Sequence, residues 1–243
     1  MVMGLKGKIC MKKREKPEIM ITEDGSRTLY FPSLDESYHS FHGALAETMH
    51  IFINAGLRFV ASQTSSITLF EMGFGTGLNA LMTFMETRSL GIAQVHYVSV
   101  EAYPVERAVC RALDYPSLMT AQDAGAVFEK MHALPWGTPA PVSPHFMLHK
   151  IEASMEAVEL EKEHFDLVYY DAFAPNLQPE LWSEALFRRV YGAMRPGAVL
   201  VTYSAKGAVK RALRGAGFSL ESLPGPKGKR EITRASRPFN AIN

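Results

Sequence analysis

Ile67-Thr-Leu-Phe-Glu-Met-Gly-Phe-Gly-Thr-Gly-Leu78 joins an apolar strand pattern to a glycine-rich turn, and residues 78–88 continue it as a helix pattern. Because glycines lack a Cβ, such a turn lets the backbone pass close to a ligand at the carboxyl ends of the strands. We therefore expect Gly73, Gly75 and Gly77 to lie against a nucleotide-like cofactor. A plain tight turn is the alternative, since G-x-G-x-G is by itself a weak signal.

Two acids narrow the choice of cofactor. Glu101 ends the next strand pattern, 24 residues after Gly77, close to the ~20 expected for a carboxylate that accepts from ribose hydroxyls. Glu71 precedes the first glycine by two residues. There it can accept from the ammonium of a methionine moiety but would repel a pyrophosphate. S-adenosyl-L-methionine is thus favoured over NAD, with ordinary strand-end or capping carboxylates as the alternative.

The chain around this turn alternates apolar strands with amphipathic helices. The alternation predicts an α/β fold with a doubly wound, mostly parallel sheet covered on both faces. After Gly217, two strand patterns around a Pro-Gly turn predict a terminal antiparallel hairpin, which completes the Rossmann-like architecture of class I methyltransferases. The expected strands are 67–72, 95–101, 145–151, 165–172 and 198–204, the helices 77–88, 104–113, 120–132, 152–163, 179–193 and 207–215, and the hairpin strands 218–223 and 230–235.

The N-terminal part of the chain has a different pattern. Residues 1–17 are polar, lysine-rich and without period, which predicts a disordered leader. The Asp24-Gly25 pair between two short apolar runs predicts a small hairpin, and residues 41–60 have helical spacing. We expect residues 18–243 to form a single domain.

Composition excludes several classes of protein. No apolar run is long enough for a signal peptide or for the ~20 residues of a membrane span. Cys10 and Cys110 have no spacing typical of a metal site or a disulfide framework. We expect a cytoplasmic protein with no metal and no membrane association.

Basic and acidic residues are unevenly distributed along the sequence, although the formal net charge is only +1. Residues 195–243 carry ten Lys and Arg against two acids, whereas residues 31–194 carry nine against nineteen. Basic ends around an acidic middle suit a protein that binds a polyanion with its terminal segments. A solvated basic tail is the alternative.

The strand at 165–172 ends in Asp171-Ala-Phe-Ala-Pro175, beside the expected cofactor crevice. A carboxylate there can orient an amine and take up its proton, which methylation of nitrogen requires. Asp171 is therefore the candidate catalytic residue, and Phe173 and Pro175 would shape the pocket. Taken singly, Asp171 reads as a helix-capping or turn aspartate, Phe173 as a core aromatic and Pro175 as a loop residue.

Several further motifs make the sequence similar to one known family. Residues 20–236 resemble the methyltransferase module of the MnmC/MnmD family, on the motifs Tyr38–Glu47, Glu71–Asn79, Ser99–Pro104, Asp171–Trp182 and Lys227–Glu231. The resemblance implies transfer of methyl from S-adenosyl-L-methionine to the amine of 5-aminomethyl-2-thiouridine at the wobble position (U34) of tRNA, giving 5-methylaminomethyl-2-thiouridine. Bifunctional members continue into a flavin-dependent oxidase, and this sequence resembles the stand-alone form, which implies a separate oxidoreductase that makes the aminomethyl precursor.

The resemblance also implies roles for residues outside the two main motifs. Asn79 joins the cofactor-binding set with Phe173, and Tyr38, His39 and Ser40 would lie over the active site. A helix N-cap at Ser40 and surface histidines are the alternative there. Cations of the last hairpin would contact tRNA phosphates: Lys227, Lys229 and Arg230.

One position departs from the family pattern. Lys150 stands where the family carries an acid that binds the adenine amino group, and Glu152 is the candidate replacement. Two other functions stay open: a methyl- or aminopropyltransferase acting on a small amine, and an RNA-binding relative that has lost the cofactor.

Overall fold

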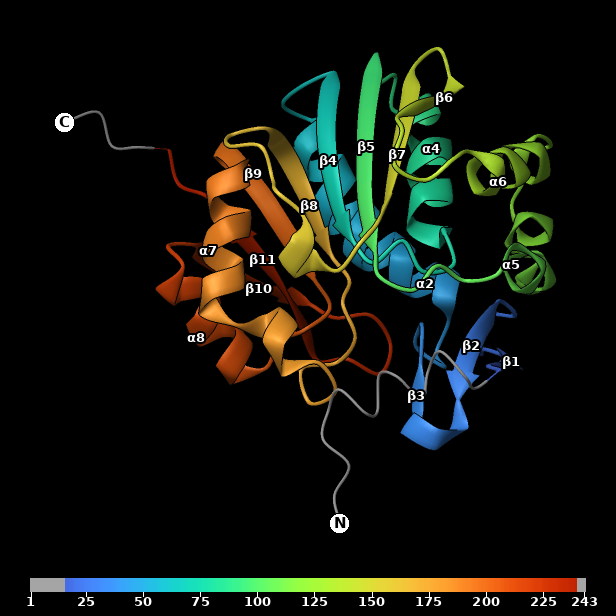
Figure 1. Ribbon diagram of the computed structural model, residues 1–243, viewed down its shortest axis with the longest axis horizontal. Coiled ribbons are helices and arrows are strands. Elements are labelled where there is room, and N and C mark those ends of the chain that lie inside the picture. The colour runs from blue at the N-terminus through green and yellow to red at the C-terminus, as the bar shows by residue number, and fades with distance from the viewer. Residues whose placement is uncertain (1–15, 240–243) are drawn as a thin grey trace.

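A computed structural model describes residues 16–239, which form one large sheet with helices on both faces and a small sheet at one end (Figure 1). Residues 1–15 of the expected leader lie outside the described part. The strands of the large sheet are β4 (Ser66–Met72), β5 (Gln94–Glu101), β6 (Ala140–Ser143), β7 (Phe146–Glu152), β8 (Phe165–Tyr170), β9 (Met194–Thr202), β10 (Ser219–Pro224) and β11 (Glu231–Ser236).

The strand order in this sheet is β10-β11-β9-β8-β4-β5-β7-β6. The five strands β7, β5, β4, β8 and β9 run parallel, and β4 lies at their centre. The chain leaves β4 toward β5 on one side and later reaches β8 on the other, so the topological switch point falls at the end of β4. Strand β11 inserts antiparallel between β9 and β10, which confirms the predicted terminal hairpin.

Alternating residues of each central strand face two separate cores. Leu69 and Tyr169 face a core covered by α4 (Leu78–Ser89), α6 (Ala124–Ala133) and a helical segment over residues 44–61. Phe70 and Tyr170 face the opposite core, under α7 (Glu184–Ala193) and α8 (Gly207–Gly215). This double covering explains why the strands read as nearly continuous apolar runs. Helix α5 (Arg107–Leu113) follows β5.

The helical segment before β4 lies directly against the sheet. It consists of α2 (Ala44–Thr48), a π-helical stretch η2 (Met49–Leu57) and α3 (Arg58–Ala61). A Cβ on Gly56 would meet Val201 at 3.0 Å, so only glycine allows this close an approach. The segment predicted over 41–60 is confirmed, and its first turns face the end of β4.

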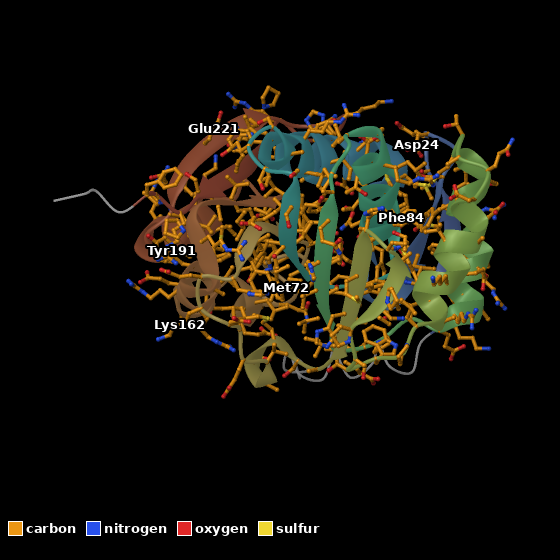
Figure 2. All side chains as sticks on the ribbon, turned by 90° about the horizontal axis from the view of Figure 1, so that it is seen from above. Asp24, Met72, Phe84, Lys162, Tyr191 and Glu221 are labelled. Carbon is orange, nitrogen blue, oxygen red and sulfur yellow. The ribbon has the colours of Figure 1, made fainter. Side chains whose placement is uncertain are left out.

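The small sheet consists of β1 (Glu18–Ile21), β2 (Arg27–Phe31) and β3 (Glu36–Ser37), and confirms the predicted hairpin. Its turn is tied to α2, because Asp24 Oδ2 accepts from the backbone N–H of Ala46 at 3.0 Å. In Figure 2, Asp24 lies toward one end of the molecule, Glu221 toward the other, and Met72 near the middle.

Two predicted helices were wrong, and one strand was missed. The helix predicted over 152–163 is only a 3-10 turn, η4 (Met155–Ala157), and the like charges Glu152/Glu156 and Glu159/Glu163 would face each other at i,i+4 in a helix. The helix predicted over 179–193 is interrupted at Ser183, whose Oγ accepts from the N–H of Leu186 and begins α7 after the 3-10 turn η5 (Pro179–Trp182). Strand β6 was missed; it is an edge strand that contains Pro141.

Candidate active site

The carboxyl ends of the central strands open onto a cavity of about 640 Å³. It lies at the switch point, where open α/β sheets bind their ligands. The small sheet, α2 and the β10–β11 turn contribute to its wall. Ten of the predicted site residues line it: Tyr38, His39, Ser40, Gly73, Gly75, Asn79, Glu101, Asp171, Phe173 and Lys229. The predicted residues that do not line it are Glu71, Gly77, Lys227 and Arg230.

The glycine turn requires glycine for two measurable reasons. Gly73 and Gly75 adopt φ of +92° and +51°, which side chains rarely tolerate. A Cβ on Gly73 would also lie 3.0 Å from the carbonyl oxygen of Asp171, and one on Gly75 would lie 3.1 Å from the Tyr38 ring. The turn therefore brings β4 close to β8 and to the small sheet, and exposes its backbone to the cavity.

Glu101 fixes the shape of the glycine turn from the neighbouring strand. Its Oε2 accepts from the N–H of Gly75 at 3.0 Å, and its Oε1 accepts from the N–H of Tyr103 at 2.8 Å. The carboxylate thus lies at the cavity wall with both oxygens oriented by backbone donors. This position suits the predicted contact with ribose hydroxyls.

Glu71 lies buried beneath the cavity rather than on its wall. The Ser99 hydroxyl donates to its Oε2 at 2.8 Å, while Oε1 has no hydrogen-bond partner within residues 16–239. Burial raises the pKa of Glu71 to about 8, against the opposing effect of Ser99. Such a group favours a nearby cation, because only a positive charge or donors can offset the cost of burying its ionised form.

Asp171 follows β8 and is held by one side chain from the helix after the glycine turn. Asn79 Nδ2 donates to Asp171 Oδ2 at 2.9 Å. Burial and, to a smaller extent, the nearby Glu47 charge raise the pKa of Asp171 to about 7, against the opposing effects of Asn79 and Lys229. A carboxylate that titrates near neutral pH is suited to take up a proton from an amine.

Tyr38 and Phe173 bring the small sheet against the loop after Asp171. Their rings meet edge to face with centroids 5.3 Å apart. The Trp182 indole fixes this loop by donating to the carbonyl of Phe173 at 2.7 Å. Two aromatic side chains therefore form one apolar side of the cavity.

The surroundings of His39 and Ser40 exclude the alternatives of a surface histidine and a helix N-cap. His39 is buried, Thr28 lies beside its ring, and burial lowers the pKa of His39 to about 4, so the ring is neutral at neutral pH. The N-cap of α2 is Gly43, so Ser40 is not the cap. Instead, the N–H of Ser40 donates to Glu47 Oε2 at 2.8 Å.

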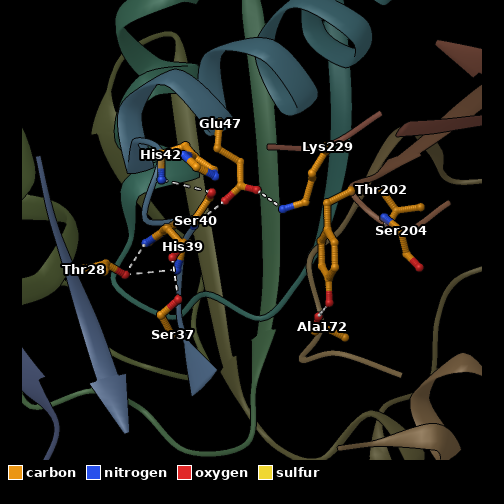
Figure 3. A network of polar contacts seen from close by, with 11 residues as sticks. Thr28, Ser37, His39, Ser40, His42, Glu47, Ala172, Thr202, Ser204 and Lys229 are labelled. Atoms are coloured by element: carbon orange, nitrogen blue, oxygen red, sulfur yellow. Dashed lines mark hydrogen bonds and ion pairs between the residues drawn. The ribbon is translucent and has the colours of Figure 1, made fainter. Parts of the chain in front are cut away.

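Glu47 is a cavity residue that was not predicted. Its Oε1 lies 2.5 Å from the ammonium of Lys229, and Figure 3 shows the two side chains meeting from opposite sides. The same ammonium lies 5.2 Å from the centroid of the Tyr203 ring, and the Tyr203 hydroxyl donates to the carbonyl of Ala172 at 2.8 Å. Glu47 lies within the Tyr38–Glu47 motif, which was the only signal in the sequence that could have indicated it.

The three cations of the terminal hairpin occupy different environments. Lys229 faces the cavity, whereas Lys227 pairs on the surface with Glu23 at 2.7 Å. Arg230 is exposed. The hairpin therefore combines one cavity lysine with a basic outer surface at the cavity rim.

Lys150 and Glu152 stand at and near the position where the resemblance implies an adenine-binding acid. Lys150 is buried, with its ammonium 4.9 Å from the Trp136 ring centroid and 5.4 Å from that of Phe74. Neither Lys150 nor Glu152 lines the cavity; Ser154 and Glu156, in the turn after β7, do. Lys150 instead packs behind the glycine turn.

Two other properties of the described chain bear on its class. Across residues 16–239, no group of three or more His, Cys, Asp or Glu side chains has a metal-binding arrangement. None of the helices in that range is long and apolar enough to cross a membrane.

Comparison with known proteins identifies the class. A family model described as S-adenosyl-L-methionine-dependent methyltransferase matches residues 142–238. The protein from Cupriavidus metallidurans named "tRNA 5-methylaminomethyl-2-thiouridine biosynthesis bifunctional protein MnmC" is 33% identical over 91% of this chain and 34% of its own length. The protein of the same name from Ralstonia nicotianae is 34% identical over 84% of this chain and 32% of its own length. The chain thus spans about a third of the length of these curated relatives.

Solved structures show the same fold. The crystal structure of MNMC2 from Aquifex aeolicus aligns with a TM-score of 0.74 and 21% identity, covering 98% of this chain and 78% of that one. Spermidine synthase from Thermotoga maritima aligns with a TM-score of 0.50 and 16% identity, over 93% of this chain and 74% of that one. Strand order, glycine turn and cavity define a class I S-adenosyl-L-methionine-dependent methyltransferase. Within that class, the chain is similar to the MnmC-type methyltransferases over most of its length.

The residues present fit S-adenosyl-L-methionine. Gly73 and Gly75 line the cavity, and Glu101 presents an oriented carboxylate next to them. The buried Glu71 has an oxygen without a hydrogen-bond partner in the described chain, as a site for a ligand ammonium requires. The cavity is large enough for a ligand of this size.

Proposed function

We propose that this protein methylates the primary amine of 5-aminomethyl-2-thiouridine at the wobble position of tRNA, giving 5-methylaminomethyl-2-thiouridine. The relatives' names supply the nucleotide, and the chemistry is supported by one observation. Asp171, a carboxylate whose pKa lies at about 7, is held by Asn79 beside the glycine turn. We further propose that a separate oxidoreductase makes the aminomethyl precursor and that the enzyme acts in the cytoplasm, where tRNA is modified.

In this proposal Glu101 holds the ribose of the cofactor, the glycine turn lies along its methionine part, and Glu71 accepts from its ammonium. When bound, S-adenosyl-L-methionine supplies an electrophilic methyl group on a sulfonium sulfur. Asp171 accepts an N–H of the neutral amine and so aims the nitrogen lone pair at that methyl group. Transfer of this methyl group would leave the electron pair of the S–C bond on sulfur. Asp171 then takes up the proton of the resulting ammonium.

The walls of the cavity suit this acceptor. Tyr38 and Phe173 offer ring surfaces to a base. Such surfaces hold an unstacked base in proteins that read single-stranded RNA. Because the aminomethyl arm is short, the uracil ring itself must enter the cavity for the amine to reach Asp171.

The direct test is mass spectrometry of nucleosides from tRNA that carries 5-aminomethyl-2-thiouridine, incubated with this protein and S-adenosyl-L-methionine. We expect a gain of one methyl group on that nucleoside. An unchanged nucleoside, with cofactor binding shown by calorimetry in the same buffer, would contradict the proposal.

One observation favours a second candidate, a methyl- or aminopropyltransferase acting on a small free amine. The cavity is lined by more acids than cations, including Glu36, Glu156 and Glu180, and would attract a small polycation. Salt dependence separates the two, because tRNA binding weakens steeply with salt through counterion release. Turnover of a small amine with no effect of added tRNA would favour the second candidate.

A further inference from the structure

Asp171 is oriented by a chain of two hydrogen bonds that begins outside the cavity. Thr48, the last residue of α2, donates from Oγ1 to Asn79 Oδ1 at 3.0 Å. Asn79 then donates from Nδ2 to Asp171 Oδ2 at 2.9 Å. Thr48 is completely buried and does not line the cavity. The side-chain hydrogen bond of Thr48 therefore links it to the cavity through Asn79.

The chemistry of the amide makes its orientation important. A side-chain amide has one acceptor oxygen and one NH₂ group with two donor hydrogens, whereas an ionised carboxylate only accepts. Asn79 serves two buried carboxylates, since its side chain lowers the pKa of both Asp171 and Glu71. Rotating the amide by half a turn would place its oxygen against these carboxylates. The Thr48 hydroxyl opposes that rotation, because it donates to the oxygen.

We propose that Thr48 is a positioning residue for methyl transfer, which holds the Asn79 amide with its NH₂ on Asp171 and thereby leaves Asp171 Oδ1 to accept from the acceptor amine. The identity of that amine rests on the proposed function. The orientation of Asn79 and Asp171 does not, because it depends only on contacts within this chain.

Removing the hydroxyl should change when Asp171 ionises. The other groups that face Asp171 are Glu47, Lys229 and Tyr203 around the cavity and the buried Glu71 and Tyr97. All of them remain in Thr48→Val, a variant of nearly the same shape without a donor. If the amide loses its fixed orientation, Asp171 loses its stabilising donor and its pKa rises. The ionised fraction at neutral pH then falls.

The test compares Thr48→Val with Thr48→Ser, which keeps the hydroxyl. The measurement is the pH profile of kcat/KM for tRNA carrying 5-aminomethyl-2-thiouridine. For Thr48→Val we expect the acidic limb to move up by about one pH unit, which is a tenfold loss of rate below the midpoint. For Thr48→Ser we expect the wild-type profile. A matched control is Thr87→Val, which removes another buried threonine hydroxyl, one that donates to the carbonyl of Phe84 away from the site.

A second measurement needs no tRNA. Calorimetry from pH 9 down to pH 6 gives the Kd of S-adenosyl-L-methionine. As the pH falls, cofactor binding by Thr48→Val should begin to weaken at a higher pH than binding by the wild type, because the cationic cofactor prefers ionised carboxylates. If the wild type binds the cofactor but does not methylate the tRNA, the proposed function fails and this titration still tests Thr48. Wild-type pH dependence of Thr48→Val in every assay that the wild type supports would overturn the inference. Equal defects in Thr48→Val and Thr48→Ser would also overturn it, since they would assign the effect to packing.

Discussion

The ammonium of Lys229 and the carboxylate of Glu47 lie 2.5 Å apart, although 182 residues separate them in the sequence. The pair joins α2 to the terminal hairpin at the cavity wall. It also places one positive and one negative charge near Asp171, and these act on the pKa of Asp171 in opposite directions. Ion pairs of this kind contribute little to stability by themselves unless they are well desolvated. Their more specific consequence here is electrostatic tuning of Asp171.

The first prediction concerns pH. The pKa of Asp171 is raised to about 7, so the carboxylate is protonated below that pH, and methyl transfer should be lost as pH falls through about 7. Glu47→Gln removes a charge that raises this pKa, so its acidic limb should move to lower pH. Lys229→Met removes a charge that lowers the pKa, so its limb should move to higher pH. The measurement is kcat/KM against pH, and shifts of the same sign in both variants would contradict the tuning.

The second prediction concerns Asp171 itself. In the proposed mechanism Asp171 orients the amine and takes up its proton, and a positioned acid or base of this kind typically contributes ~10²–10⁴ in rate. We expect Asp171→Ala to cause a loss in that range under single-turnover conditions. A matched control is Asp123→Ala, which removes an exposed aspartate paired with Arg88 on the surface. Near-wild-type turnover of Asp171→Ala would exclude its catalytic role.

The third prediction uses two glutamates at the same level of adjacent strands. Glu101 and Glu152 pair in register at the ends of β5 and β7, but only Glu101 lines the cavity. Glu101→Ala should weaken cofactor binding by about 1.5–3 kcal/mol, the usual contribution of a charge-assisted hydrogen bond. Glu152→Ala should leave the calorimetric Kd unchanged. Similar losses in both variants would indicate a general effect of charge rather than a ribose contact.

The fourth prediction links Glu71 to stability. Its folded-state pKa of about 8 lies above the ordinary value of 4.5, so the folded protein binds the proton more tightly. The stability from this group is fully present below about pH 4.5 and is lost as pH rises through 8. The Tm of Glu71→Gln should therefore fall less between pH 6 and pH 9 than the Tm of the wild type. Each kcal/mol of pH-dependent stability that the substitution removes corresponds to a difference of about 2–4 °C in Tm. An equal fall in both proteins would contradict the buried, proton-binding role.

Local sequence patterns could predict much of this molecule because the relevant information is contiguous. The glycine turn, Glu101 and the Asp171 loop each follow directly from a strand, and strand ends of a parallel sheet gather at one edge. The terminal hairpin was predictable for the same reason. Residues 152–163 were wrongly predicted as a helix, because their apolar spacing resembled one while repeated acids at i,i+4 opposed it.

The contacts that the sequence did not reveal connect distant elements. Glu47 and Thr48 reach the site from α2, and Thr48 contacts Asn79 across 31 residues. Lys229 was predicted as a phosphate ligand from its charge and the family motif. Only the folded hairpin shows that its side chain faces Glu47. Lys150 stands where the resemblance implies an acid, yet it packs on Trp136 and Phe74, a placement that depends on the turn between α6 and β6.

The last prediction separates the outer face of the terminal hairpin from its cavity lysine. Lys227 and Arg230 are exposed, and the surface pair of Lys227 with Glu23 is easily exchanged for a phosphate contact. The double variant Lys227→Ala, Arg230→Ala should keep normal cofactor binding and bind tRNA more weakly. Its plot of log K against log salt should be shallower by about 0.7–0.9 for each phosphate that the variant no longer neutralises.

The control for this variant is Lys162→Ala, which removes an exposed lysine just before β8, at the edge of the sheet opposite the cavity. That variant should bind tRNA with the wild-type affinity and slope. Lys229→Met should change the pH profile of methyl transfer while leaving the salt slope close to the wild-type value, because its ammonium is engaged by Glu47. If the double variant retained the wild-type tRNA affinity and slope, the hairpin would be a solvated turn. The phosphate contacts would then lie along the basic stretch from Arg195 to Arg214, where Lys206, Arg211 and Arg214 are exposed.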